Sequence, residues 1–103
     1  MTIQVMDVES MQKFSVDEVK PIMLHQSDGF VTLLLCLEAG QKVGPCTMTN
    51  RVLYLVLEGQ GQLSVAGEQQ QWLNANSLVV VPVGVERTLS AKERSRVLAI
   101  QVP

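Results

Sequence analysis

The sequence predicts an all-β protein, a sandwich or barrel of short antiparallel strands. Runs rich in Val, Leu and aromatic residues recur along the 103 residues, and Gly, Pro, Asn or Asp separate them at regular intervals. No stretch supports a helix longer than about two turns. The length suits one domain, and no linker, internal repeat or low-complexity segment divides the chain.

The first third of the chain is expected to start with a polar segment and then enter the sheet. SVDE at 15–18 is a capping-box pattern that predicts one helical turn before Pro21. IMLHQ at 22–26 is a short strand candidate, and FVTLLLCLE at 30–38 is a strand that is apolar on both faces. SDG at 27–29 predicts the turn between them, because Asp-Gly readily adopts positive φ.

The remaining strands follow with similar punctuation. Residues 51–58 (RVLYLVLE) form a β-branched and aromatic run that ends at a glycine. Residues 61–73 read as a hairpin that turns at Ala66-Gly67-Glu68, and 76–91 as two strands joined by a Pro-x-Gly turn. Residues 95–103 (SRVLAIQVP) supply the last strand.

Composition excludes several classes of function. The net charge of −2 gives no electrostatic reason to expect a nucleic-acid or anionic-membrane partner. No window reaches the roughly 18 consecutive apolar residues of a membrane span, and the N-terminus lacks a signal-peptide pattern. A cytoplasmic location is therefore expected, with Cys36 and Cys46 as free thiols.

Several strands are apolar on both faces, which a solvated single sheet would not tolerate. One face must line an interior. The other face must be covered by the N-terminal segment, by a second sheet or by a second subunit. A homodimer is the expected assembly, although burial within one chain explains the pattern as well.

The spacing of glycines and prolines resembles the two motifs of the cupin superfamily. The first motif is G-x5-H-x-H-x(3,4)-E-x6-G, and the chain matches its spacing with Gly40, Cys46, Met48, Val52 and Gly59. The second is G-x5-P-x-G-x2-H-x3-N. Its positions fall in this sequence on Asn76, Pro82, Gly84, Arg87 and Ala91.

The resemblance covers Phe30 to Pro103 and implies a small single-domain, RmlC-like cupin. The implied fold is an antiparallel double-stranded β-helix, the jelly-roll barrel, over residues 30–103. Residues 1–29 would be an N-terminal extension with the first strand or strands packing on the barrel.

The same resemblance argues against the metal centre of these proteins. Its four ligand positions map to Cys46, Met48, Val52 and Arg87, whereas such sites need converging imidazole and carboxylate donors. Val52 cannot donate, and the fixed positive charge of Arg87 would repel a divalent ion. No cofactor is therefore expected.

A soft-metal site is an alternative. Cys46 and Met48 are two residues apart, so on a strand they would share a face, and thiolate with thioether suits Cu(I). Cys36 and Met23 would add donors only if they reached the same pocket. The simpler expectation is that the methionine fills a gap and the cysteine acts as a small hydrophobe.

In place of a metal site, the resemblance implies a ligand pocket in the barrel. Strand alternation predicts a lining of Cys46, Met48, Val52, Tyr54, Val56, Arg87 and Leu89. This apolar cup with one phenol and one guanidinium would suit a small ligand that has an apolar body and a carboxylate or phosphate. The competing expectation for Arg87 is a rim residue paired with Glu86, Glu93 or a backbone carbonyl.

No catalytic residue is predicted, and the enzyme question stays open with a lean toward no activity. The single histidine, His25, lies outside both motifs and is expected at the surface, where it is poorly placed as a general base. The preferred hypothesis is a metal-independent cupin that binds a small, partly apolar or anionic ligand. The alternatives are a metal-dependent cupin enzyme of the dioxygenase or isomerase kind with an atypical site, and a structural or interaction protein.

Overall fold

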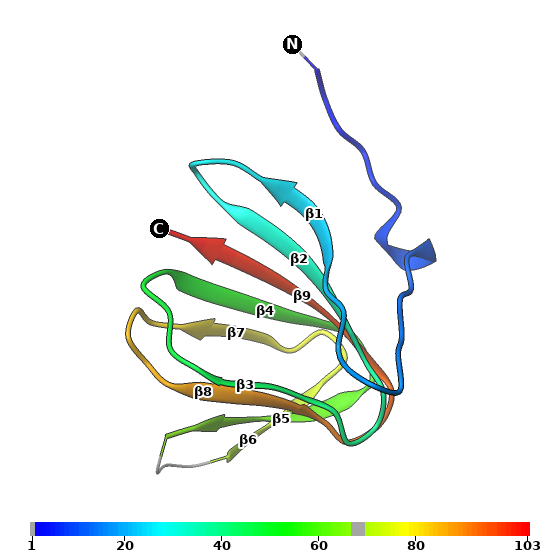
Figure 1. Ribbon diagram of the computed structural model, residues 1–103, viewed down its shortest axis with the longest axis vertical. Coiled ribbons are helices and arrows are strands. Elements are labelled where there is room, and N and C mark those ends of the chain that lie inside the picture. Colours follow the sequence, from blue (N-terminus) through cyan, green and yellow to red (C-terminus); the bar gives the residue numbers. More distant parts are fainter. Residues whose placement is uncertain (1, 67–69) are drawn as a thin grey trace.

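The computed structural model describes residues 2–66 and 70–103, and in these residues it has nine β-strands and one short 3-10 helix (Figure 1). The helix is η1 (Val8–Ser10), and the strands are β1 (Ile22–Gln26), β2 (Val31–Leu37), β3 (Lys42–Cys46), β4 (Arg51–Glu58), β5 (Gln60–Val65), β6 (Gln70–Asn74), β7 (Leu78–Val81), β8 (Arg87–Ala91) and β9 (Ser95–Val102). All strand pairs are antiparallel. The all-β prediction is confirmed. The sequence pattern missed β3, because Gly44 and Pro45 interrupt it.

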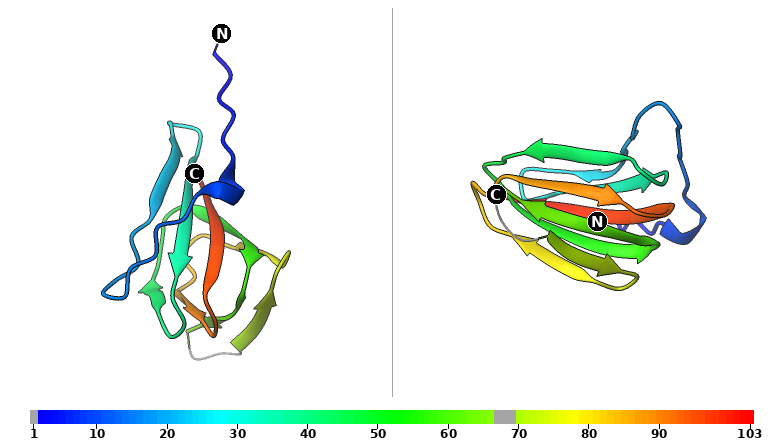
Figure 2. Two further views of the ribbon diagram at one scale, coloured as in Figure 1. Left: turned by 90° about the vertical axis from the view of Figure 1, so that its right-hand side faces the viewer. Right: turned by 90° about the horizontal axis from the view of Figure 1, so that it is seen from below.

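The strands form two facing sheets. Sheet A has the order β1-β2-β9-β4-β7, and sheet B has the order β3-β8-β5-β6. From β2 onward the chain passes back and forth between the sheets, so β9 lies between β2 and β4 while β8 lies between β3 and β5 (Figures 1 and 2). This arrangement is the double-stranded β-helix, or jelly roll, that the motif spacing implied.

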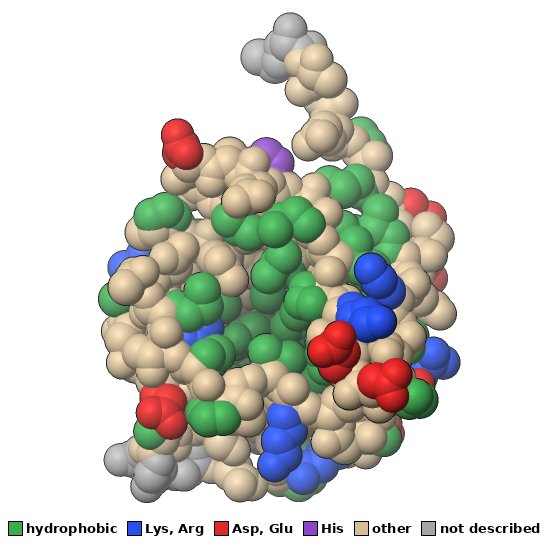
Figure 3. Space-filling model, in the orientation of Figure 1, with side chains coloured by type: hydrophobic (Ala, Val, Ile, Leu, Met, Phe, Trp, Pro, Cys, Tyr) green, Lys and Arg blue, Asp and Glu red, His purple; other side chains and the backbone are tan. Residues whose placement is uncertain are grey.

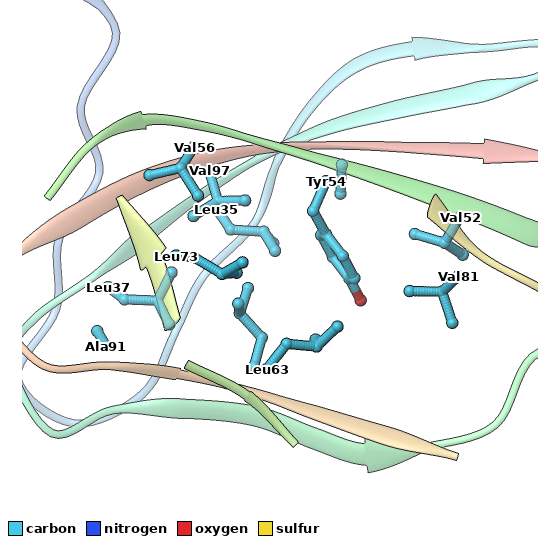
Figure 4. Close-up of a cluster of buried hydrophobic side chains, with 12 residues drawn as sticks. Leu35, Leu37, Val52, Tyr54, Val56, Leu63, Leu73, Val81, Ala91 and Val97 are labelled. Atoms are coloured by element: carbon cyan, nitrogen blue, oxygen red, sulfur yellow. The ribbon is translucent and has the colours of Figure 1, made fainter. Parts of the chain in front are cut away.

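Side-chain alternation places one face of each sheet in a shared interior. On β4, Val52, Tyr54 and Val56 are buried, while the residues between them are half-buried on the opposite face. Leu35 and Leu37 of β2 meet them from the same sheet, and Figure 4 shows these side chains gathered with those of sheet B. Each fully buried Leu or Val contributes about 1.5–3 kcal/mol to folding.

Four positions matched to the motif glycines have left-handed backbone. Gly40, Gly59 and Gly84 have φ values of +88°, +94° and +80°. Asn76, which stands where the second motif begins with glycine, has φ of +73°. Asparagine is one of the few other residues that adopt this conformation readily, so the substitution preserves the turn.

Two local expectations are wrong. Residues 15–18 form no helical turn. A single turn closes too few hydrogen bonds to offset the entropy cost of nucleating a helix. The Ser15 carbonyl instead accepts a hydrogen bond from Gln41 Nε2 at 2.5 Å. The turn after β1 lies where it was predicted, but neither Asp28 nor Gly29 has positive φ. The predicted turn at Ala66–Glu68 lies mostly outside the described residues.

The opposite face of sheet A is also largely apolar, as expected from strands that are apolar on both sides. The N-terminal segment covers part of it. Leu34 and Cys36 of β2 are fully buried there, and the backbone N–H of Lys13 donates to Cys36 Sγ at 3.4 Å. Within the described ranges, no helix is long and apolar enough to cross a membrane.

Candidate functional site: a cup with a buried arginine

The pocket residues predicted from the sequence lie in or beside the interior between the two sheets, and two of them, Val56 and Leu89, line its small residual cavity. We call Cys46, Met48, Val52, Tyr54, Arg87 and Leu89 the cup. Val52 and Tyr54 enter it from β4 of sheet A, and Arg87 and Leu89 from β8 of sheet B. These four side chains are between 1% and 4% exposed, whereas Cys46 and Met48 are half-buried. The buried residues therefore form the floor of the cup, and the two sulfur-containing residues lie toward solvent.

A β-bulge in β3 brings Cys46 to the cup. Val43 pairs with Leu89 and Cys46 pairs with Arg87, so β3 uses one more residue than β8 over this interval. Without the extra residue, positions 43 and 46 would point to opposite faces. Gly44 is required at the bulge, because it has φ of +108° and an added Cβ would lie 2.7 Å from the Arg87 carbonyl oxygen.

Met48 reaches the cup by a different route from the one predicted. The sequence interpretation placed Cys46 and Met48 on the same face of one strand. β3 ends at Cys46, and Met48 lies in the loop that follows, where its carbonyl accepts a hydrogen bond from Gly84 N at 3.0 Å. Its side chain still packs against the core cluster, so the loop rather than strand alternation places it.

Arg87 is the unusual residue of the cup. It is 2% exposed, its Nε donates to the Tyr54 hydroxyl at 3.3 Å, and its Cζ lies 5.9 Å from the centre of the Tyr54 ring. No carboxylate of the described residues lies within ion-pair distance of its guanidinium. The rim alternative is therefore wrong, since Glu86 and Glu93 are exposed and neither pairs with it.

Side chains fill most of the interior between the described strands. A residual cavity of about 10 Å³ lies among Leu37, Val56, Leu73 and Leu89, and it holds at most one water. Tyr54 extends from β4 across the interior, with Leu63 and Leu73 on one side of its ring and Val52 with Val81 on the other (Figure 4). Figure 3 shows a hollow between the sheets, lined mainly by hydrophobic side chains. A ligand larger than one water would therefore need the interior side chains to move apart.

The residues at the metal-ligand positions do not fit a cupin metal centre. Val52 offers no donor atom, and the buried positive charge of Arg87 opposes a cation in the same space. In the described part of the chain, no group of three or more His, Cys, Asp and Glu residues could hold a metal ion. Cys36 faces the opposite side of sheet A, and Met23 lies on edge strand β1 with 53% exposure, so neither completes a soft site with Cys46 and Met48.

His25 is placed differently from the surface position predicted. It is half-buried on β1, and its ring stacks on Phe30 with centroids 4.3 Å apart. Among the described side chains, its Nε2 is the buried polar atom with no hydrogen-bond partner. The stacking with Phe30 spans the β1–β2 turn, a contact that strand patterns do not reveal. His25 lies outside the cup.

Comparison with known proteins supports the fold. No protein-family model and no curated protein sequence matches the chain. An RmlC-like cupin protein from Desulfovibrio desulfuricans superposes with a TM-score of 0.91 at 18% identity, covering 99% of this chain and 98% of its own. A cupin superfamily protein from Desulfitobacterium hafniense has a TM-score of 0.86 at 22% identity, with coverage of 99% and 93%. A conserved protein of unknown function from Streptococcus pyogenes has a TM-score of 0.84 at 19% identity, with coverage of 99% and 89%.

Proposed function

We propose that this protein, which has the cupin fold, binds a small monocarboxylate with an apolar body in the cup, without a metal ion. The observation that carries the proposal is the Arg87 guanidinium, buried in an apolar interior with no carboxylate partner among the described residues. A buried cation costs several kcal/mol unless an anion compensates it. A bound carboxylate would provide that anion.

The arrangement of donors favours one negative charge. Arg87 Nε is occupied by the Tyr54 hydroxyl, which leaves the two terminal nitrogens as donors for a ligand. Two parallel N–H groups match the two oxygens of a carboxylate. Val52, Met48 and Leu89 offer apolar contact to the rest of the molecule, and a doubly charged phosphate would leave one charge uncompensated in these surroundings.

The cup residues support binding rather than acid–base catalysis. A general base needs an imidazole, a carboxylate or a similar group within hydrogen-bond reach of the substrate. The cup contains a thiol, a thioether, a phenol and a guanidinium, and the phenol oxygen accepts a hydrogen bond from Arg87. His25 lies on the outer side of edge strand β1, away from the cup.

Calorimetric titration with a series of aliphatic and aromatic monocarboxylates, each beside its primary amide, tests the proposal. We expect at least one carboxylate to bind, its amide to bind at least tenfold more weakly, and Arg87→Met to lose at least tenfold in affinity. Arg94→Met is the matched control, because Arg94 is exposed and pairs with Glu38 outside the cup.

Two outcomes contradict the proposal. Equal binding of acid and amide, or unchanged affinity in Arg87→Met, would mean that the guanidinium does not recognise the ligand. Stoichiometric copper(I) binding that is lost in Cys46→Ser would favour the soft-metal alternative instead.

A further inference from the structure

Cys46 lies directly opposite the buried arginine of the cup. Strands β3 and β8 are antiparallel neighbours, and Cys46 is the register partner of Arg87. Directly opposite residues of such a pair extend from the same face of the sheet, with Cβ atoms about 4.5–5.5 Å apart. The thiol and the guanidinium therefore start from adjacent points on one face.

The guanidinium of Arg87 has unused donors. The residue is 2% exposed, and among the residues that the structure describes its side chain donates only from Nε, to the Tyr54 hydroxyl. The terminal nitrogens Nη1 and Nη2 have no acceptor in that part of the chain. Buried charged donors are normally paired and hydrogen-bonded. The two nitrogens together match a group that carries two oxygens and one negative charge.

The two cysteines of the chain have contrasting surroundings. Cys46 is half-buried on β3, an edge strand, and lies beside the Arg87 cation. Cys36 is 0% exposed on β2, and its Sγ accepts a hydrogen bond from the backbone N–H of Lys13 at 3.4 Å. Cysteines that react with oxidants are partly accessible and have electropositive neighbours, whereas enclosed cysteines are inert. Cys46 has the features of the first kind, and Cys36 has those of the second.

We propose that Cys46 is a site of oxidation by hydrogen peroxide, and that the stable product is a sulfinate paired with Arg87. In the first step the thiolate sulfur attacks one peroxide oxygen, the O–O bond breaks, and hydroxide leaves, which gives the sulfenic acid. A second peroxide oxidises the deprotonated sulfenic acid in the same way, and water is released. One thiol and two peroxides thus give one sulfinate, one proton and two waters. Sulfur loses four electrons, and each peroxide gains two.

The sulfinate compensates the charge that the reduced cup leaves unpaired. Its two oxygens share one negative charge, as those of a carboxylate do, and Nη1 and Nη2 of Arg87 offer two N–H donors to them. The added oxygens extend from the sulfur, so the oxidised side chain reaches further than the thiol. Peroxide is also a small reagent, which suits an interior whose residual cavity holds at most one water.

Oxidation of Cys46 also regulates carboxylate binding. The sulfinate and a bound monocarboxylate compete for the same two nitrogens of Arg87, so the oxidised protein should bind no carboxylate. This consequence rests on the proposed function. The oxidation itself rests only on the position of Cys46 beside the buried guanidinium.

Peptide mass spectrometry of the full chain after graded peroxide treatment tests the modification. We expect Cys46 to gain two oxygen atoms at least tenfold faster than Cys36 in the folded protein, and the two rates to become similar in urea. Sulfinate formation at Cys46 should slow at least fivefold in Arg87→Met. Arg94→Met is the matched control, because it removes an exposed cation that pairs with Glu38, and it should leave the rate unchanged.

Cys46→Asp tests the pairing without any oxidant, because it places a permanent carboxylate opposite Arg87. We expect its Tm to exceed that of Cys46→Asn by at least about 4 °C, and this difference to disappear in the Arg87→Met background. Circular dichroism checks that each variant is folded.

Equal oxidation of Cys36 and Cys46 in the folded protein, or an unchanged Cys46 rate in folded Arg87→Met, would overturn the oxidation site. A Cys46→Asp variant that is less stable than Cys46→Asn would overturn the pairing with Arg87.

Calorimetry of reduced and oxidised protein with the same series of monocarboxylates separates this inference from the proposed function. Binding by the reduced protein alone supports the regulation, and equal binding by both forms overturns it. Binding by neither form, with oxidation of Cys46 still dependent on Arg87, overturns the proposed function and its regulation and supports the oxidation site.

Discussion

Replacing Arg87 with methionine should stabilise the unliganded protein while abolishing carboxylate binding. Arg87 is 2% exposed, so its guanidinium has lost most of its hydration, at an effective cost of several kcal/mol. Methionine keeps the volume of the side-chain stem and removes the charge, so no large cavity is left.

Two terms oppose this gain. The substitution removes the 3.3 Å hydrogen bond from Arg87 Nε and leaves the buried Tyr54 hydroxyl without its donor, which costs about 2 kcal/mol. The contact with the Tyr54 ring, at 5.9 Å, lies near the limit of a cation–π interaction and is worth about 0.5 kcal/mol. We expect a net stabilisation of about 1–2 kcal/mol, or about 5–10 °C in Tm for a domain of this size.

Chemical denaturation and thermal melts, with and without the best-binding carboxylate, measure both effects. At 100 times its Kd the ligand should stabilise the wild type by about 2.7 kcal/mol and leave Arg87→Met unchanged. A loss of more than about 2 kcal/mol in unliganded Arg87→Met, with the ligand effect retained, would refute the reasoning. Arg87 would then be a structural element of the core.

Three further substitutions test other parts of the account. Tyr54→Phe removes the hydroxyl that accepts the Arg87 hydrogen bond and orients the guanidinium. Carboxylate affinity measured by calorimetry should fall about three- to tenfold while the protein stays folded. Unchanged affinity would show that Tyr54 does not contribute to ligand binding. Asn76→Ala should cost about 1–2 kcal/mol in urea denaturation because φ is +73°, whereas Asn76→Gly should be nearly neutral; equal losses would show that the side chain, not the backbone, matters. Arg96 Nη1 donates to the carbonyls of Val8 and Met11, so Arg96→Met should release this segment from the sheet. Its amide hydrogen exchange should become at least tenfold faster. Unchanged exchange would show that other contacts hold the segment in place.

Much of the fold could be predicted because its signals are local. Glycines at 40, 59 and 84 mark left-handed turns, and alternation along β4 places Val52 and Tyr54 inside. β3 was missed because a bulge at Gly44 and Pro45 breaks the alternation on which strand prediction depends.

The composition of the cup was predictable, but its internal contacts were not. Strand alternation brought Val52, Tyr54, Arg87 and Leu89 to one interior. The burial of Arg87 and its bond to Tyr54 arise between residues 33 positions apart, so spacing carries no information on them. The same holds for Arg96, whose carbonyl partners lie more than 80 residues earlier in the chain.

The most direct test of the central claim is the NMR signal of the Arg87 Nε–H group during titration with a monocarboxylate. We expect a saturable shift of this signal, no such shift with the matching amide, and unchanged signals from the exposed Arg51 and Arg94. A titration in which only Arg51 and Arg94 respond, or in which acid and amide act alike, would contradict the assignment of the cup as a carboxylate-binding site.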